Sequence, residues 1–298
     1  MKKPLVGAFA ALLLLGAGAA PAAADAGQDR APAQTDSQSA APTQSKPKQK
    51  PKAVDFAGTV ALSNCSGAVI RLPDSEPQDP ALVMSNGHCV ESGFPRPGEV
   101  LVDQPSTRTF TLLNAAGRGV TTLRASKISY ATMTDTDVSL YELTSTYEQI
   151  ESAHRIKALE LSAERPAAAT AISVVSGYWK RVYSCDIDGF AYQLREGAWT
   201  WKDSVRYTSD CKTIGGTSGS PVVDEATGKV VAVNNTGNES GQRCTDNNPC
   251  EVDENGNVTV RPGINYGQQT YQIVPCVGVG NKIDLTAPGC ELPRPAGE

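Results

Sequence analysis

The sequence predicts an all-β protein with one short helix. Short runs rich in Val, Ile, Leu and Thr recur along the chain with turn residues between them, which is typical of a barrel or sandwich. Two of the turns, Asp224–Gly228 and Asn255–Gly256, are typical of β-hairpins. Only residues 146–161 favour a helix. The expected strands are 67–72, 81–84, 99–102, 108–113, 120–130, 138–143, 170–175, 221–223, 229–233, 258–260 and 270–274.

The first 24 residues have the order of a secretory signal peptide. Lys2 and Lys3 precede an apolar run from Leu5 to Leu15, and small residues follow as far as Ala24. The apolar run is too short to cross a bilayer as a helix, which takes about 20 residues. We therefore expect a secreted, extracellular protein with no stable membrane insertion, cleaved after Ala24 or, as the rival site, after Ala26.

Residues 25–52 differ in composition from the rest of the chain. They are rich in Ala, Gln, Pro, Ser and Lys and contain no aromatic residue. Such a segment cannot bury enough apolar surface to offset its ordering entropy, so we expect a disordered propeptide or linker. Residues 53–298 then form the folded domain, which is long enough to enclose sizeable cores.

The charge of the domain excludes one class of partner. The first 52 residues carry seven Lys and Arg against three Asp and Glu, so the remainder carries 20 against 29, a net charge of −9. An acidic domain without a basic stripe argues against nucleic acid as a ligand.

All eight cysteines lie in the domain, and an even number in an exported chain indicates disulfides. A zinc site competes poorly because the chain has no Cys-x-x-Cys pair and only two histidines. Proximity in the sequence favours three of the pairs, although six cysteines allow 15 pairings. These pairs are Cys185–Cys211, Cys244–Cys250 and Cys276–Cys290.

Three motifs carry candidate chemistry, and their order along the chain is informative. They are Ser-Asn-Gly-His-Cys at 85–89, Thr-Asp-Val-Ser-Leu at 136–140 and Gly-Thr-Ser-Gly-Ser-Pro at 216–221. The order His, Asp, Ser resembles that of the trypsin/chymotrypsin-like serine peptidases. The chain is most similar to their secreted bacterial trypsin-like and glutamyl-endopeptidase-like members.

The resemblance implies two six-stranded Greek-key β-barrels, at about 53–145 and 162–285, joined by a short helix. It also implies a Cys65–Cys89 disulfide that would fix His88 to the first barrel. A serine hydroxyl needs a base within hydrogen-bond reach, and imidazole suits that task near neutral pH. The other histidine, His154, lies among charged residues and is expected on a solvated helix face.

In this resemblance Ser218 is the nucleophile, His88 the base and Asp137 the carboxylate that orients it. Asp135 is the rival for Asp137, which is preferred because it directly precedes an apolar run. The backbone N–H groups of Gly216 and Ser218 would form the oxyanion hole.

Two departures from the animal trypsins alter the expectations. Thr217 stands where trypsins have the aspartate that pairs with a new N-terminus, so activation by that ion pair should not operate. Pro288, Pro293 and Pro295 argue against the usual C-terminal helix.

Substrate preference has two alternative interpretations. Lys212 stands six residues before Ser218, where the family places the floor of its primary pocket. There it would favour acidic substrates, but it could equally face solvent or pair with Asp210. By the same resemblance Asn234 and Asn235 lie on the strand that pairs with an extended substrate.

The sequence therefore predicts a monomeric serine endopeptidase acting on proteins or peptides, with no cofactor and no metal. The alternative is a non-catalytic binding homologue of the same fold. An esterase with this triad is a third possibility. Residues 253–257 have alternating oxygen ligands, but an Asn-Gly hairpin explains them as well as calcium does.

Overall fold

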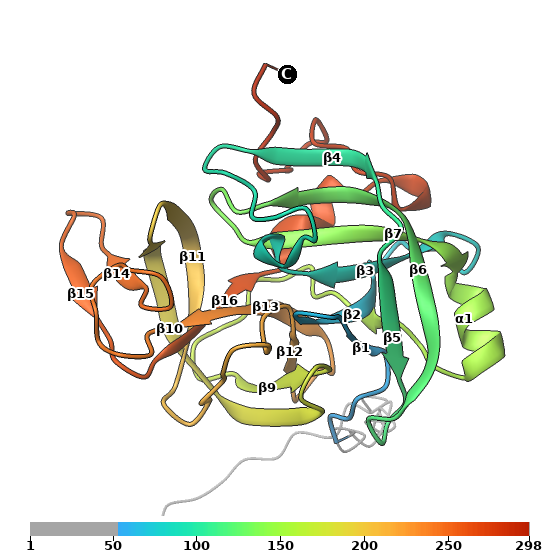
Figure 1. Ribbon diagram of the computed structural model, residues 1–298, viewed down its shortest axis with the longest axis horizontal. Coiled ribbons are helices and arrows are strands. Elements are labelled where there is room, and N and C mark those ends of the chain that lie inside the picture. The colour runs from blue at the N-terminus through green and yellow to red at the C-terminus, as the bar shows by residue number, and fades with distance from the viewer. Residues whose placement is uncertain (1–52, 298) are drawn as a thin grey trace, which may run out of the picture. The chain divides into compact units, whose positions relative to one another are not determined.

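The computed structural model describes residues 53–297, and Figure 1 shows how their elements are arranged. Every described strand belongs to one compact unit. The expected signal peptide and disordered segment lie outside the described residues. No helix within residues 53–297 has the length and apolar character needed to cross a membrane.

Six strands of the first half close into a barrel. Around the ring they follow the order β1-β2-β3-β7-β6-β5, and β1 closes it by pairing with both β2 and β5. Two strands extend this sheet, because β4 pairs with β6 and β8 pairs in parallel with β2. The strands are β1 (Thr59–Ala61), β2 (Ser66–Arg71), β3 (Pro80–Ser85), β4 (Val100–Pro105), β5 (Thr109–Leu113), β6 (Gly119–Thr132), β7 (Val138–Thr146) and β8 (Leu159–Glu160).

The second half repeats this topology strand for strand. Its ring runs β9-β10-β11-β16-β13-β12 and closes through β12 and β9, while β14 pairs with β10 and β15 with β14. In each ring the fourth strand returns to lie beside the first, which is a Greek key. The predicted all-β fold of two six-stranded barrels is confirmed. The strands are β9 (Ala171–Ser176), β10 (Arg181–Glu196), β11 (Trp199–Tyr207), β12 (Pro221–Asp224), β13 (Val230–Gly237), β14 (Cys250–Val252), β15 (Val258–Val260) and β16 (Asn265–Gln269).

Strand β3 is buried on both faces, which explains its continuous apolar sequence. Ala81 and Val83 belong to the core inside the first barrel. Leu82 and Met84 pack in a second cluster that includes residues of β12 and β13 from the other barrel. Burial of a Leu or Met side chain contributes about 1.5–3 kcal/mol. Packing therefore fixes the end of β3, where the His88 motif begins, at the junction of the two barrels.

The helix α1 (Tyr147–His154) is shorter than the predicted 146–161. It begins with a capping box, in which Thr146 and Gln149 each accept a hydrogen bond from the backbone N–H of the other. It ends because Arg155 adopts the left-handed conformation, with φ of 56°. The chain then extends, and Leu159–Glu160 joins the first sheet as β8.

The expected strand at 270–274 is wrong. Tyr271–Cys276 form a 3-10 helix, η2, in which Ile273 and Cys276 are buried at the three-residue spacing of that helix. Pro275 lies inside it and has no N–H to give to a sheet. After the 3-10 turn η3 (Val279–Asn281) the described chain, as far as residue 297, contains no further helix, as the prolines predict.

Four disulfides join all eight cysteines, in the same pairs that the sequence and the resemblance favoured. They are Cys65–Cys89, Cys185–Cys211, Cys244–Cys250 and Cys276–Cys290. Disulfides persist in oxidising compartments and are rare in the cytosol. The cysteine chemistry therefore fits a protein that folds outside the cytoplasm.

Candidate active site

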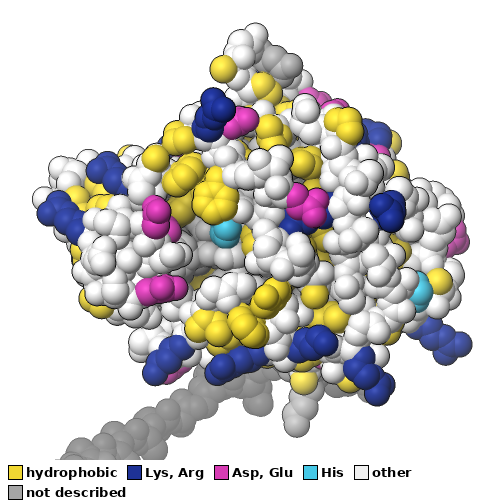
Figure 2. Space-filling view, in the orientation of Figure 1, with side chains coloured by type: hydrophobic (Ala, Val, Ile, Leu, Met, Phe, Trp, Pro, Cys, Tyr) yellow, Lys and Arg dark blue, Asp and Glu magenta, His cyan; other side chains and the backbone are white. Residues whose placement is uncertain are grey.

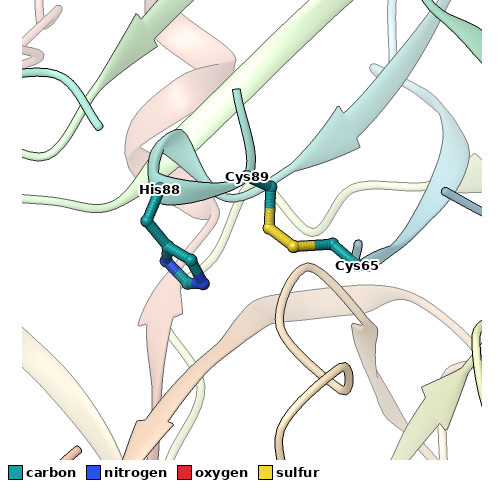
Figure 3. Close-up of side chains that lie close together, drawn as sticks. All are labelled: Cys65, His88 and Cys89. Atoms are coloured by element: carbon teal, nitrogen blue, oxygen red, sulfur yellow. A yellow bond between two sulfur atoms is a disulfide. The ribbon is translucent and has the colours of Figure 1, made fainter. Parts of the chain in front are cut away.

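His88 lies in a short 3-10 turn, η1 (Gly87–Cys89), directly after β3. Its neighbour Cys89 is bonded to Cys65 at the start of β2, and Figure 3 shows how this disulfide ties the turn to the barrel. Gly87 is required here, because a Cβ at that position would lie 2.1 Å from the carbonyl oxygen of Thr132. The turn is thus held from both sides, and the imidazole is presented at the barrel end.

Asp137 contacts His88 at two points. Its Oδ2 lies 2.7 Å from Nδ1 of the ring, and its Oδ1 accepts the His88 backbone N–H at 3.0 Å. Asn86 donates its side-chain N–H to the carbonyl oxygen of Asp137 at 2.8 Å. The Asp137 side chain is fully buried, whereas that of His88 is 19% exposed. The two-point contact orients the ring and favours a proton on Nδ1.

The rival carboxylate, Asp135, has a different partner. It adopts a positive φ of 60° and its Oδ2 pairs with Lys202 Nζ at 2.7 Å, on the surface. The structure therefore brings Asp137 to His88, and not Asp135.

The electrostatic balance at His88 favours the charged ring. Burial disfavours the imidazolium, but the Asp137 carboxylate more than offsets this and raises the pKa of His88 above its ordinary value. Glu196 contributes in the same direction. The site thus stabilises a positive charge on His88, as a base that accepts a proton requires.

Ser218 lies in the loop between β11 and β12, on the second barrel. Gly216 and Gly219 flank it with φ of 88° and 80°, a region that side chains disfavour. The Ser218 hydroxyl donates to the Asn235 carbonyl oxygen at 3.3 Å. Neither the Gly216 nor the Ser218 backbone N–H donates to another described residue.

Ser66 of the first barrel holds this loop in place. The Ser66 backbone N–H donates to the Ser218 carbonyl oxygen at 2.8 Å. The Ser66 hydroxyl donates to the Gly216 carbonyl oxygen at 3.1 Å. Trp179 holds the preceding carbonyl, because its indole N–H donates to Gly215 at 2.7 Å.

Thr217 is buried in an uncharged network. Its hydroxyl donates to the Ile214 carbonyl oxygen, and Asn234 donates its amide to both the carbonyl and the hydroxyl oxygen of Thr217, at 3.2 Å each. Thr217 stands where trypsins have an aspartate. Neutral hydrogen bonds therefore hold the loop here, without the charged partner that an aspartate would need.

His88 and Ser218 line one cavity of about 480 Å³ that both barrels form. In Figure 2 the face of the molecule is hollowed near its centre, with acidic and hydrophobic side chains around the hollow. Asn234 and Asn235 line the cavity. Lys212 is exposed and does not line it, whereas its neighbour Thr213 turns inward and donates to Asn265 at 2.7 Å.

Several residues of the cavity are not among the predicted ones. The carboxylates Glu196, Glu239 and Asp246 line it, and Phe94, Trp199 and Trp201 form aromatic walls. Glu196 ends β10 and Gly197 follows it. A Glu-Gly pair between two strand-like segments is a signal for a hairpin, and it could have placed Glu196 at the turn.

Two groups of side chains have donor atoms of the kind that bind metals, but those atoms are already engaged. Cys65, His88 and Cys89 lie within 4.8 Å of one another, but the two sulfurs are bonded to each other and offer no thiolate. At the 253–257 hairpin, Asp253 already accepts hydrogen bonds from the backbone of Asn255 and from Asn257. Its oxygens are therefore used within the turn.

Two Greek-key barrels, with a histidine–aspartate pair at the end of one and a serine loop on the other, define a two-barrel peptidase architecture. The sequence matches the trypsin-like peptidase domain family over residues 65–233. The chain belongs to this family, whose members act on proteins or peptides. No curated protein matches the chain.

Solved structures similar to this chain at low identity include three proteases. The MamO protease domain of Magnetospirillum magneticum is 14% identical, with 74% of this chain and 95% of that one covered and a TM-score of 0.45. The active form of the Rv3671c protease of M. tuberculosis is 14% identical, with 85% and 96% covered and a TM-score of 0.47. The thermostable serine protease AL20 from an extremophilic microorganism is 15% identical, with 75% and 93% covered and a TM-score of 0.41.

Proposed function

We propose that the protein is a secreted serine endopeptidase that hydrolyses peptide bonds through an acyl-enzyme. Ser218 attacks the carbonyl carbon, and His88 takes its proton and gives it to the leaving amine. Asp137 holds the ring and stabilises the imidazolium. The backbone N–H groups of Gly216 and Ser218 bind the oxyanion. Water then attacks the acyl-enzyme by the same route.

One observation carries the proposal. His88 is fixed by two hydrogen bonds to the buried Asp137, and it lines the same cavity as Ser218. The free N–H of Gly216 lies in the loop that holds the serine. The reaction requires one local change, in which the Ser218 hydroxyl leaves the Asn235 carbonyl and donates to Nε2 of His88. Such contacts often tighten only when substrate binds.

Fluorophosphonate labelling of the exported protein tests the proposal. Ser218→Ala and His88→Ala should abolish labelling. The matched controls are Ser220→Ala, in the same loop, and His154→Ala, the other histidine, and both should label like the parent. Circular dichroism shows whether the proteins are folded. If the folded parent and the folded controls all fail to label, the peptidase proposal is wrong and the non-catalytic binding homologue takes its place.

The exported form also tests secretion. Mass spectrometry of the protein from the culture medium should show an N-terminus after Ala24 or Ala26, or near residue 53 where residues 25–52 are removed as a propeptide. Recovery of the uncleaved chain from the cytoplasm alone would contradict the secreted assignment.

A further inference from the structure

Apart from His88, the charged groups of the active-site cavity are carboxylates. Glu196, Glu239 and Asp246 line it, and no Lys or Arg does so among residues 53–297. Among the same residues, His88 is the one further ionisable side chain on its wall. Two of the carboxylates, Glu239 and Asp246, are exposed at the rim, so their charge is largely screened. Glu196 differs from them in its surroundings.

Glu196 is a carboxylate with one buried oxygen and few hydrogen bonds. Its Oε1 accepts the Asn247 backbone N–H at 2.7 Å. Its Oε2 is buried and meets no full hydrogen-bond geometry, although the Thr236 side chain is a nearby donor. Burial raises the pKa of Glu196, while the Thr236 side chain, the Asn247 backbone N–H and the charge of His88 oppose the shift. A buried carboxylate with so few hydrogen bonds is costly, and a cation brought into the cavity would lower that cost.

A second polar side chain on the cavity wall, that of Asn235, lacks hydrogen-bond partners. Asn235 is only 4% exposed, and neither its amide oxygen nor its amide nitrogen has a hydrogen-bond partner in the described chain. Buried amide groups are normally hydrogen-bonded. Because Asn235 lines the same cavity as Glu196, its oxygen is a second acceptor for a donor-rich ligand group.

The aromatic walls suit the same kind of ligand. Phe94 and Trp199 meet edge to face with ring centroids 5.9 Å apart, and Trp199 is held by its indole N–H, which donates to the Pro95 carbonyl at 3.0 Å. A guanidinium or ammonium group gains electrostatic attraction over such rings, and its alkyl stem gains apolar contact.

We propose that Glu196, with Asn235 and the aromatic wall, selects a cationic Lys or Arg side chain of the substrate near the scissile bond. This assignment rests on the proposed peptidase function. It does not follow from the trypsin motif, because the motif's pocket position is Lys212, which lies outside the cavity. It replaces the acidic preference that Lys212 would give.

Matched substrates test the selection. In a fluorogenic peptide, arginine is compared with its uncharged isostere citrulline at each of the four positions before the scissile bond. We expect kcat/KM to favour arginine at one position by about tenfold or more, as a charge-assisted hydrogen bond provides. Glu196→Gln should reduce that ratio to near one, while Lys212→Met, the control outside the cavity, should leave it unchanged.

The outcomes separate this inference from the proposed function. If the protein labels with fluorophosphonate but shows no arginine preference at any position, or prefers glutamate, the inference is overturned and the peptidase stands. If it does not label, the peptidase fails. Tighter binding of the arginine peptide than the citrulline peptide to Ser218→Ala, measured by calorimetry, supports the selection without using catalysis. Because the parent ratio needs no Glu196 variant, misfolding of Glu196→Gln leaves the test intact.

Discussion

Replacement of Asp137 by asparagine should nearly abolish activity without unfolding the protein. The two contacts of Asp137 are not equivalent: Oδ1 accepts a backbone N–H at 3.0 Å and Oδ2 faces Nδ1 of His88 at 2.7 Å. Asparagine has one acceptor and one donor in their place. If its oxygen keeps the backbone N–H, its NH2 group must donate to Nδ1.

This donation forces the proton of neutral His88 onto Nε2, the atom that must accept the proton of Ser218. The opposite orientation of the amide brings its NH2 group against the backbone N–H, with two donors facing at about 3 Å, which costs about 1–3 kcal/mol. We therefore expect Asp137→Asn to lose about 10⁴-fold in kcat, equivalent to about 5.5 kcal/mol, the size of effect that a wrong tautomer produces in such triads.

The assay is the rate of fluorophosphonate labelling together with peptide hydrolysis, and nitrogen NMR of His88 reports the tautomer directly. Asp135→Asn is the control, since its surface ion pair with Lys202 is worth no more than about 1 kcal/mol and does not reach His88. Retention of activity within about tenfold in Asp137→Asn, or an equal loss in Asp135→Asn, would refute the reasoning.

Three further predictions follow from the surroundings of His88. The pKa of His88 is raised, and the ring must be neutral to accept a proton. We therefore expect kcat/KM to rise with pH along a limb centred above about 6.5. A pH–rate profile whose limb is centred below that value would contradict this prediction. The double variant Cys65→Ser with Cys89→Ser opens a loop of 24 residues. Denaturant titration should then show the free energy of unfolding fall by about 3.5 kcal/mol. An unchanged midpoint would exclude this stabilisation by the disulfide. Gly87→Ala places a Cβ against the Thr132 backbone and should cost about 3 kcal/mol in thermal unfolding. Gly278→Ala serves for comparison, because its φ is −96° and its Cβ would meet only the Lys282 carbonyl oxygen, at 3.8 Å.

The fold was predictable where side chains alternate or run apolar. The continuous apolar residues of β3 and the hairpin of β12 and β13 are strong signals, because packing selects Val, Ile and Leu there. The long β10–β11 hairpin escaped prediction because its strands carry many charged residues and their buried positions are irregularly spaced, so they show no alternation. β16 escaped because Asn265, Gln268 and Gln269 are polar yet buried, and hydrogen bonds to other elements, not apolar packing, hold them.

The candidate site shows the same division. Motifs with short local spacing identified His88, Asp137 and Ser218, since each stands beside a glycine or at a strand boundary that its sequence marks. Lys212 was placed by counting residues from Ser218, and counting cannot tell which of two neighbours turns inward. Glu196 reaches the cavity from a strand more than twenty residues before Ser218, so only the tertiary structure brings the two to one wall.

The contact of Ser66 with the Ser218 loop has a consequence for biosynthesis. The chain is made from its N-terminus, so the half that contains Ser66, His88 and Asp137 emerges before the half that contains the serine loop. The loop can be held at its two carbonyls only when it meets a completed first barrel. Under the proposed mechanism, a nascent or truncated chain therefore holds the base without its nucleophile. We then expect hydrolytic activity only after the last strands have closed the second barrel.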